Sequence, residues 1–162
     1  TGRLFDAVSS LIGIKDTISF EAQAAIGLQM ISEQRLNDIY SINSYPIEIN
    51  HKDNILELNF QKLFEELIND IRKKEEKSLI GIKFHKSLCD ALVNASKLIS
   101  YEIETNIIIL SGGVFQNRIL LKYLVDRLEA DNFKALTHRN IPCNDAGIST
   151  GQILLANYQN KK

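Results

Sequence analysis

A run of β-branched residues that ends at two glycines constrains this sequence more than any other feature. Residues 106–110 read Asn-Ile-Ile-Ile-Leu, and Ser111, Gly112 and Gly113 follow before a helix-forming segment begins. This order is typical of a strand that leads through a tight loop into a helix, where backbone N–H groups can hold an anion. Residues 142–147 place Asp145 beside a glycine at the mouth of another predicted helix. Two loops of similar design could therefore face one ligand.

Length and composition restrict the class of protein. The chain has 162 residues, of which 44% are hydrophobic, and this predicts one domain with a single core. The alternation of strands and helices in its last third, described below, makes the expected fold α/β. A net charge of −1 without a long basic run does not favour direct binding of nucleic acid. The apolar runs are too short for a membrane span. Cys89 and Cys143 are too few for a disulfide framework or a zinc knuckle, so a reducing, cytoplasmic setting fits best. The chain opens at Thr1 without an initiator Met or a signal-peptide pattern, so we interpret residues 1–162 as a single-domain fragment of a longer polypeptide.

Hydrophobic periodicity predicts a helix-rich amino-terminal part. Apolar residues between Leu4 and Ile12 recur at helical spacing and stop at Gly13, and an Ala-rich helix is expected over residues 21–39. Residues 40–59 alternate around a polar tip at 50–54, which indicates a hairpin. A surface helix at 60–74, a charged break at 73–77 and a long core helix at 78–100 follow.

The last third alternates between strands and helices. Strands are predicted at 106–110 and 133–137, and helices at about 115–130 and 145–158. This βαβα tail implies a parallel pair of strands, and ligands of such sheets bind at the carboxyl ends of the strands.

Several residues are candidates for a site, each with a structural alternative. Gly112 and Gly113 fit a phosphate cradle and a plain tight turn equally well. Asn117 could bind a ribose or an acyl group, or cap a helix. For Asp145, local sequence prefers a helix cap over a metal ligand. Asp6 lies among apolar positions and so needs a partner such as a ribose, whereas Glu21 reads first as a helix amino-terminal charge and second as a ribose ligand.

The remaining reactive side chains carry no recognisable site. His51, His85 and His138 share no metal-ligand spacing, so each is predicted to be structural or solvated. Cys89 is expected to fill the core, and Cys143 has no visible activating histidine. No catalytic residue can be assigned from the sequence.

Five ordered segments resemble one family, the HypF carbamoyltransferases of hydrogenase maturation. A looser form of the same motifs occurs in the TsaD-type transferases that modify tRNA, but the Phe-Gln-Asn-Arg and Phe-Glu-Ala-Gln versions, together with residues 40–85, favour HypF. The segments that carry the resemblance are residues 2–8, 20–25, 84–85, 110–118 and 144–152.

The resemblance implies a fold and a reaction. The fold would be the second lobe of an actin-like ATPase (ASKHA) domain, whose early strands and first lobe precede residue 1. The whole enzyme would form carbamoyl adenylate from carbamoyl phosphate and ATP in an upstream domain. The lobe represented by this chain would then help pass the carbamoyl group to the carboxyl-terminal cysteine of HypE.

The resemblance also implies roles for individual residues. Asp6 and Glu21 would bind the ribose, Gly112 and Gly113 would approach the phosphate, and Asn117 would contact the nucleotide or acyl region. Asp145 would ligate a divalent metal or iron together with two histidines of the missing amino-terminal lobe. Ala22 and Ala146 replace glycines that the family often has, which is a mild departure.

Three functional hypotheses stay open at this level. The first is an enzyme fragment that binds nucleotide weakly and is inactive alone; the second is a non-catalytic module that binds a nucleotide or docks a maturation partner; the third is a TsaD-like lobe that acts on tRNA. Absence of the first lobe would also uncover apolar surface, so self-association is expected.

Overall fold

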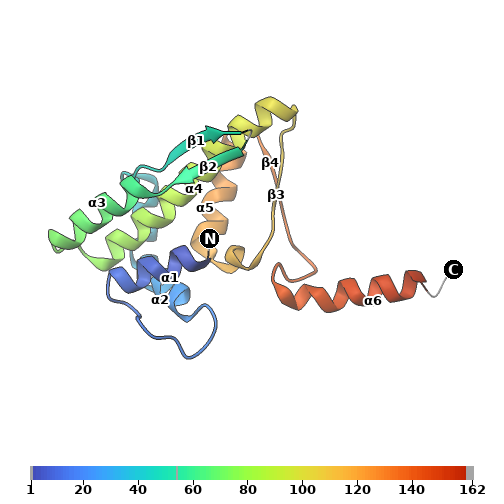
Figure 1. Cartoon of the computed structure of the whole chain (residues 1–162), viewed down its shortest axis with the longest axis horizontal. Helices are drawn as coiled ribbons and strands as arrows, with labels where there is room; N and C mark the ends of the chain where they lie inside the picture. Colours follow the sequence, from blue (N-terminus) through green and yellow to red (C-terminus); the bar gives the residue numbers. More distant parts are fainter. Residues whose placement is uncertain (1, 54, 160–162) are drawn as a thin grey trace.

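The computed structural model describes residues 2–53 and 55–159 of the chain. Its helices are α1 (Gly2–Leu11), α2 (Gln23–Ser32), α3 (Gln61–Arg72), α4 (Lys77–Ile103), α5 (Arg118–Ala130) and α6 (Ile148–Gln159), with 3-10 turns η1 (Glu33–Tyr40), η2 (Gly113–Gln116) and η3 (Asp145–Gly147). The strands are β1 (Glu48–Lys52), β2 (Ile55–Asn59), β3 (Ile107–Leu110) and β4 (Lys134–Thr137). Figure 1 shows these elements in chain order.

Helix α4 is the spine of the molecule. Its amino-terminal half is buried nearly all round, because α2, α3, α5 and η1 pack against it from different sides. Apolar residues at the predicted spacing supply this core, including Ile82, Phe84 and Leu88. Cys89 is fully buried and its pKa is raised by burial, which confirms the prediction of a core cysteine. The fully or largely buried apolar residues form one continuous cluster.

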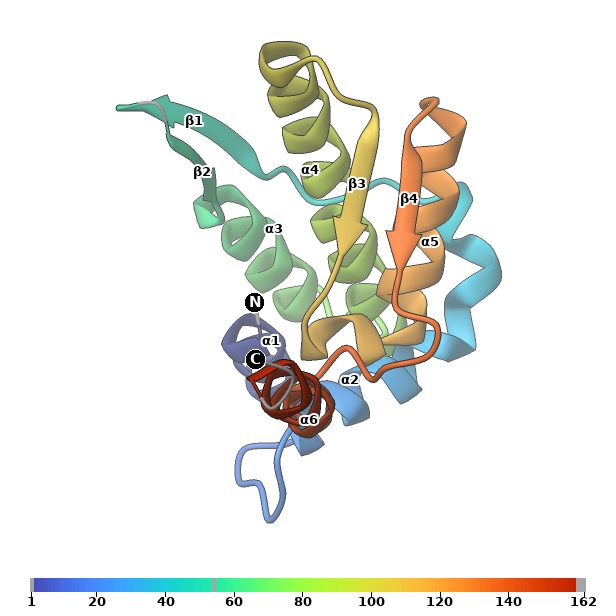
Figure 2. The ribbon, with the colours of Figure 1, turned by 90° about the vertical axis from the view of Figure 1, so that its right-hand side faces the viewer.

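The carboxyl-terminal third has the predicted βαβα order. Strands β3 and β4 pair in parallel, with Ile107 opposite Lys134 and Leu110 opposite Thr137, and α5 connects them. Figure 2 shows the two strands side by side with α4 and α5 behind them. The carboxyl ends of both strands therefore point to the same end of the sheet.

The predicted hairpin is also present. Strands β1 and β2 pair antiparallel, with Glu48 opposite Asn59. Its entry is anchored by buried Tyr45, whose hydroxyl donates to Asp70 at 2.8 Å, and Asp70 in turn pairs with Lys83 of α4 at 2.8 Å. Residue 54, part of the predicted polar tip, lies outside the described residues.

One predicted helix is wrong in its second half. The segment 21–39 is not continuous, because α2 ends at Ser32 and the chain continues as the 3-10 turn η1, which is interrupted at Arg35 (φ −116°, ψ 21°). The Ser32 hydroxyl donates to the Leu28 carbonyl at 2.6 Å at the last turn of α2. A serine that bonds back to the carbonyl four residues earlier often bends a helix, and α2 ends at this serine.

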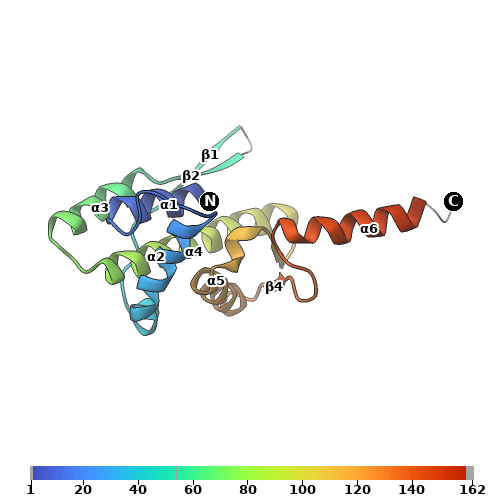
Figure 3. The same ribbon diagram turned by 90° about the horizontal axis from the view of Figure 1, so that it is seen from below.

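Helix α6 leaves the body of the molecule. None of its residues is buried, and Figures 1 and 3 show it extending away from the other helices. Apolar side chains nevertheless dominate it, and Ile153, Leu154 and Leu155 are all exposed. Among the described residues, no helix is long and apolar enough to cross a membrane.

Candidate functional site

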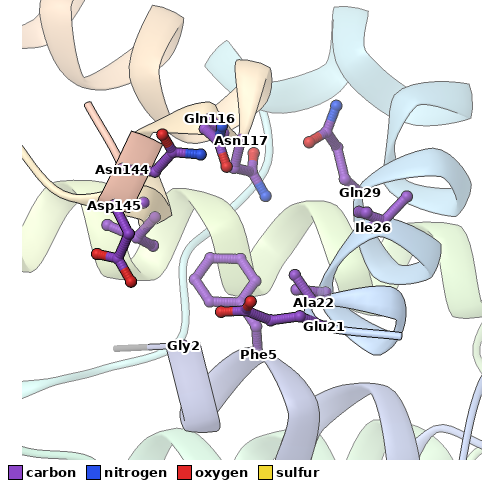
Figure 4. A pocket seen from close by; sticks show the side chains of 13 residues that line it. Gly2, Phe5, Glu21, Ala22, Ile26, Gln29, Gln116, Asn117, Asn144 and Asp145 are labelled. Atoms are coloured by element: carbon purple, nitrogen blue, oxygen red, sulfur yellow. The ribbon is translucent and has the colours of Figure 1, made fainter. Parts of the chain in front are cut away.

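A cavity of about 640 Å³ lies where the amino-terminal helices meet the carboxyl ends of β3 and β4. Helices α1 and α2 form one side, and the loops that follow the two parallel strands form the other (Figure 4). This is where a parallel sheet is expected to present a ligand. The lining residues are Gly2, Phe5, Glu21, Ala22, Ala25, Ile26, Gln29, Gly113, Val114, Gln116, Asn117, Asn144 and Asp145.

Gly112 and Gly113 have different structural roles. Gly112 has φ 109° and ψ 156°, a conformation that only glycine adopts without strain, and its carbonyl accepts from the Phe115 N–H at 3.1 Å. Gly113 opens η2 and lines the cavity, whereas Gly112 does not. The prediction that a tight turn needs glycine is therefore confirmed at Gly112.

Asn117 caps α5 and also lines the cavity. Its side-chain oxygen Oδ1 accepts from the Leu120 N–H at 3.0 Å, and its nitrogen Nδ2 lies 2.9 Å from Nε2 of His85. Asn117 is buried, with 9% of the residue exposed, yet Figure 4 shows its side chain at the edge of the cavity. The predicted cap is thus present, and it coexists with a position from which a ligand can be reached.

His85 lies beneath the cavity in the middle of α4. Its Nδ1 is 2.7 Å from the Gly81 carbonyl, and its ring packs edge-on against Phe5 with centroids 5.3 Å apart. Complete burial lowers the pKa of His85 to about 4, so the ring is neutral near pH 7. The prediction of a structural histidine is confirmed, but nothing in its sequence spacing revealed the contact with Asn117.

Glu21 and Ala22 form the turn that leads into α2. Glu21 precedes α2, which begins at Gln23, so it is not a residue of the helix. It is exposed, and its side chain points into the cavity (Figure 4). Ala22 has φ 60° and ψ 9°, a left-handed conformation that favours glycine. A residue without a β-carbon would be unstrained at this position, which is where the resemblance expects a glycine.

Asp145 faces Glu21 across the cavity from the first position of η3 (Figure 4). The cap that the sequence assigned to Asp145 is made by Asn144, whose Oδ1 accepts from the Ala146 N–H at 3.2 Å. Asp145 lies in the first turn of η3, the position expected for a carboxylate that interacts with the helix dipole. The turn is tight, since a β-carbon on Gly147 would lie 2.9 Å from the Pro142 carbonyl oxygen. The carboxylate of Asp145 is consequently left facing the cavity.

Asp6, like Gly112, is a predicted site residue that does not line the cavity. The prediction placed it among core positions, but its side chain is partly exposed, while its neighbours Phe5 and Val8 are buried. Residue 6 therefore lies between the inner and outer faces of α1. No buried charge therefore requires a ligand hydroxyl to explain it.

The charge of the cavity is negative. Its described lining contains two carboxylates, Glu21 and Asp145, together with the amides of Gln29, Gln116, Asn117 and Asn144, and no lysine, arginine or histidine. Within residues 2–53 and 55–159 no three His, Cys, Asp or Glu side chains gather closely enough to hold a metal ion. Asp145 offers one oxygen ligand, so these residues do not make a metal site by themselves.

Several polar groups near the cavity were not predicted from the sequence. Gln29, Gln116 and Asn144 line it, although glutamine and asparagine carry no distinctive spacing in the sequence. At the carboxyl ends of the two parallel strands, His138 Nε2 lies 2.8 Å from the Ser111 hydroxyl. Both side chains are exposed, and the parallel register of β3 and β4 accounts for their meeting.

Comparison with known proteins defines the class. The family model described as "Carbamoyltransferase, Kae1-like Domain, second subdomain" matches residues 1–152. The chain belongs to this family.

The relatives it resembles are HypF proteins. It is 34% identical over 153 residues to the carbamoyltransferase HypF of Synechocystis sp., and 32% identical over 154 residues to the probable carbamoyltransferase HypF of Methanocaldococcus jannaschii. Each alignment covers 94% of this chain but 19% of the relative, so the chain spans about a fifth of their length.

A solved structure shows the same fold. Full-length HypF, crystallised in a phosphate- and nucleotide-bound form, matches 97% of this chain and 24% of its own length, with 36% identity and a TM-score of 0.84. The HypF structure of T. kodakarensis, at 22% identity and a TM-score of 0.77, agrees in fold. The α/β architecture expected from the sequence is confirmed.

Proposed function

We propose that this chain supplies one wall of a carbamoyl-transfer site and that its cavity binds the nucleotide part of carbamoyl adenylate. The observation that carries the proposal is the cavity itself, which gathers Glu21, Gly113, Asn117 and Asp145 from distant parts of the sequence. Family membership and the HypF relatives support a carbamoyltransferase. In this proposal residues 1–162 act as one unit, the second lobe of an actin-like ATPase domain.

The shape and polarity of the cavity suit a nucleoside. Phe5, Ala25, Ile26 and Val114 provide an apolar surface for a base, and the neighbouring amides provide donors and acceptors. In this proposal Glu21 accepts hydrogen bonds from the ribose hydroxyls, and Asp6 is a second ribose ligand, reached by the part of the nucleotide that extends beyond the lining of the cavity. The backbone at Gly112 and Gly113 would approach the phosphate.

The negative charge of the cavity requires a partner. A phosphate between Glu21 and Asp145 meets like charge on this wall and no basic side chain in the described lining, so cationic groups must come from elsewhere. We propose that Asp145 is one ligand of a divalent metal or iron whose other ligands lie outside this chain. The acceptor of the carbamoyl group would be the carboxyl-terminal cysteine of a HypE-type protein.

Calorimetric titration with AMP and ATP tests the proposal. This chain alone should bind each nucleotide with a dissociation constant of about 1 mM or weaker. The loss of translational and rotational freedom on binding is the same as in the complete site, but only the contacts of this chain are available to offset it. Submillimolar affinity would show that the wall is sufficient, contrary to the proposal.

Substitution in the longest polypeptide that carries this sequence tests the chemistry. Asp145→Asn should lower carbamoyl transfer at least about tenfold while binding of the acceptor protein stays unchanged. Glu57→Gln, an exposed charge on the hairpin, is the matched control and should leave transfer intact. Unchanged transfer in Asp145→Asn would instead favour a docking module in which the loops serve only as turns.

A further inference from the structure

We propose that His85 is a positioning residue that fixes the side-chain amide of Asn117 with its N–H group directed at the ligand in the cavity. The inference rests on the proposed function, because it takes the cavity to be a nucleotide site. Three hydrogen bonds in sequence carry it, and they link Gly81, His85, Asn117 and Leu120.

The protonation of the chain of hydrogen bonds is determined from both ends. The Gly81 carbonyl can only accept, so the proton of the neutral imidazole must be on Nδ1, 2.7 Å away. Nε2 then carries a lone pair and can only accept. The group of Asn117 that faces it at 2.9 Å must therefore be the Nδ2 amide, as a donor.

The far end gives the same orientation independently. The Leu120 N–H can only donate, so the atom of Asn117 that faces it at 3.0 Å must be the oxygen Oδ1. A flipped amide would put two donors against each other at Leu120 and two acceptors against each other at His85. Both errors would be buried, where each unmade bond costs more than it does in water.

Within the described chain, these two bonds use one of the two Nδ2 protons of Asn117. The second proton remains available to a ligand oxygen at the edge of the cavity (Figure 4). Without His85 the side chain would be held by the helix cap alone, with one hydrogen bond in place of two, and Nδ2 would lose its buried partner.

His85 also ties this amide to the rest of the cavity. Its ring contacts Phe5, which lines the cavity, with centroids 5.3 Å apart. One turn earlier in α4, a β-carbon on Gly81 would collide with the Ser32 hydroxyl at the end of α2, so α2 and α4 approach closely at that level. The histidine thus sits where α1, α4 and α5 meet under the site.

Two substitutions of His85 separate positioning from packing. A glutamine amide oxygen can take the place of Nε2 and accept from Asn117, whereas an asparagine reaches only as far as Nδ1. His85→Asn should weaken AMP binding by the longest polypeptide that carries this sequence about fivefold, and His85→Gln should stay within about twofold. Thermal unfolding of each variant monitors any general loss of stability.

Coupling with Asn117 is the decisive readout. Asn117→Ser keeps a capping oxygen but has no amide to be positioned. If His85 acts through Asn117, adding His85→Asn to Asn117→Ser should change AMP affinity by less than about twofold. Equal losses in both backgrounds, or equal affinities of His85→Asn and His85→Gln, would overturn the positioning role while leaving the nucleotide site in place.

A spectroscopic measurement does not depend on whether the variants fold. Long-range ¹H–¹⁵N spectra of this chain should show the His85 proton on Nδ1, and a proton on Nε2 would overturn the proposal. Absence of AMP binding by the unsubstituted polypeptide would contradict the proposed function itself. AMP binding that is equally affected by His85→Asn and His85→Gln would contradict only the positioning role of His85.

Discussion

Ala22 is the residue at which the backbone of the site is strained. A residue with a β-carbon in the left-handed region costs about 1–2 kcal/mol, and Ala22 is exposed, so packing returns little of that cost. Ala22→Gly should therefore raise the free energy of unfolding by about 0.5–1 kcal/mol after the added freedom of the unfolded chain is subtracted. Urea denaturation measures the difference.

The matched control for that substitution is Ala7→Gly. Ala7 is also exposed, but it lies inside α1 in a helical conformation, where glycine costs about 1 kcal/mol. Opposite signs at the two positions are expected. A loss of stability at both would mean that Ala22 contributes packing that outweighs its strain.

Burial of neutral His85 makes stability depend on pH. Its pKa falls from an ordinary 6.5 to about 4 on folding, so the unfolded chain takes up a proton between these values that the folded chain does not. The contribution is present in full above pH 6.5 and is lost as the pH falls toward 4, at up to about 1.4 kcal/mol per pH unit. The hydrogen bond to the Gly81 carbonyl and the charge of Glu33 both act to raise the pKa of His85, but the effect of burial outweighs them.

Urea denaturation at a series of pH values, on the native sequence and on His85→Gln, checks this dependence. Subtracting the two curves removes the titration of the carboxylates that both proteins share. The difference should be flat above pH 6.5 and fall below it. A flat difference throughout would mean that water reaches the ring.

At the scale of elements, the close packing of α2 on α4 depends on Gly81. A β-carbon there would collide with the Ser32 hydroxyl and contact Leu28 at 3.2 Å. Gly81→Ala should destabilise the protein by about 1–3 kcal/mol despite the better helix propensity of alanine. Adding Ser32→Ala should restore part of the loss, as measured by thermal unfolding.

Gly151 provides the contrasting glycine. It is also inside a helix, α6, but a β-carbon there would meet nothing within 4 Å. Gly151→Ala should therefore strengthen α6 and increase the helical signal in circular dichroism. Equal effects of alanine at positions 81 and 151 would contradict the packing account.

Elements with long, consistent patterns could be predicted from the sequence, and elements decided by tertiary contacts could not. The apolar stripe of α4 and the β-branched run of β3 gave their type and approximate bounds. The end of α2 at Ser32 and the non-helical backbone at Arg35 are not marked by any break in the helix-favouring sequence of residues 21–39.

The site shows the same division. Glu21, Gly113, Asn117 and Asp145 do line one cavity, but their role as ligands remains a prediction. The exposure of Asp6 depends on which side of α1 its neighbours cover, and helical spacing leaves a residue at the edge of the stripe undecided. The bond between His85 and Asn117 joins positions 32 residues apart and could not be seen in the sequence.

At the scale of the whole molecule, exposed apolar surface predicts self-association. Leu154 and Leu155 on α6, and Ile109 on β3, are each more than half exposed. On α6 the exposed residues Ile153, Leu154 and Leu155 follow one another, and exposed apolar surface that gathers on a monomer marks an interaction surface. The isolated chain should therefore form larger species as its concentration rises, as measured by multi-angle light scattering.

Replacing both leucines by lysine, Leu154→Lys with Leu155→Lys, should shift the chain toward monomer. Helix α6 has no buried residue, so the body should keep its unfolding temperature. Gln152→Lys, on the same helix, adds a charge without removing a large apolar side chain and is the control. A monomer at every concentration in the native sequence would contradict the prediction.

The two sides of the cavity differ in stiffness. On one side, Asn117 is held by a buried hydrogen bond to His85 of α4. On the other side, Asp145 lies in η3, directly before α6, which has no buried residue. Local opening is easiest where few contacts are buried, so a ligand in the cavity would meet a rigid side at Asn117 and a more mobile side at Asp145. Ordering the Asp145 side on binding costs conformational entropy and therefore lowers the affinity for the ligand. A partner that holds α6 in place beforehand would remove this cost and raise the affinity.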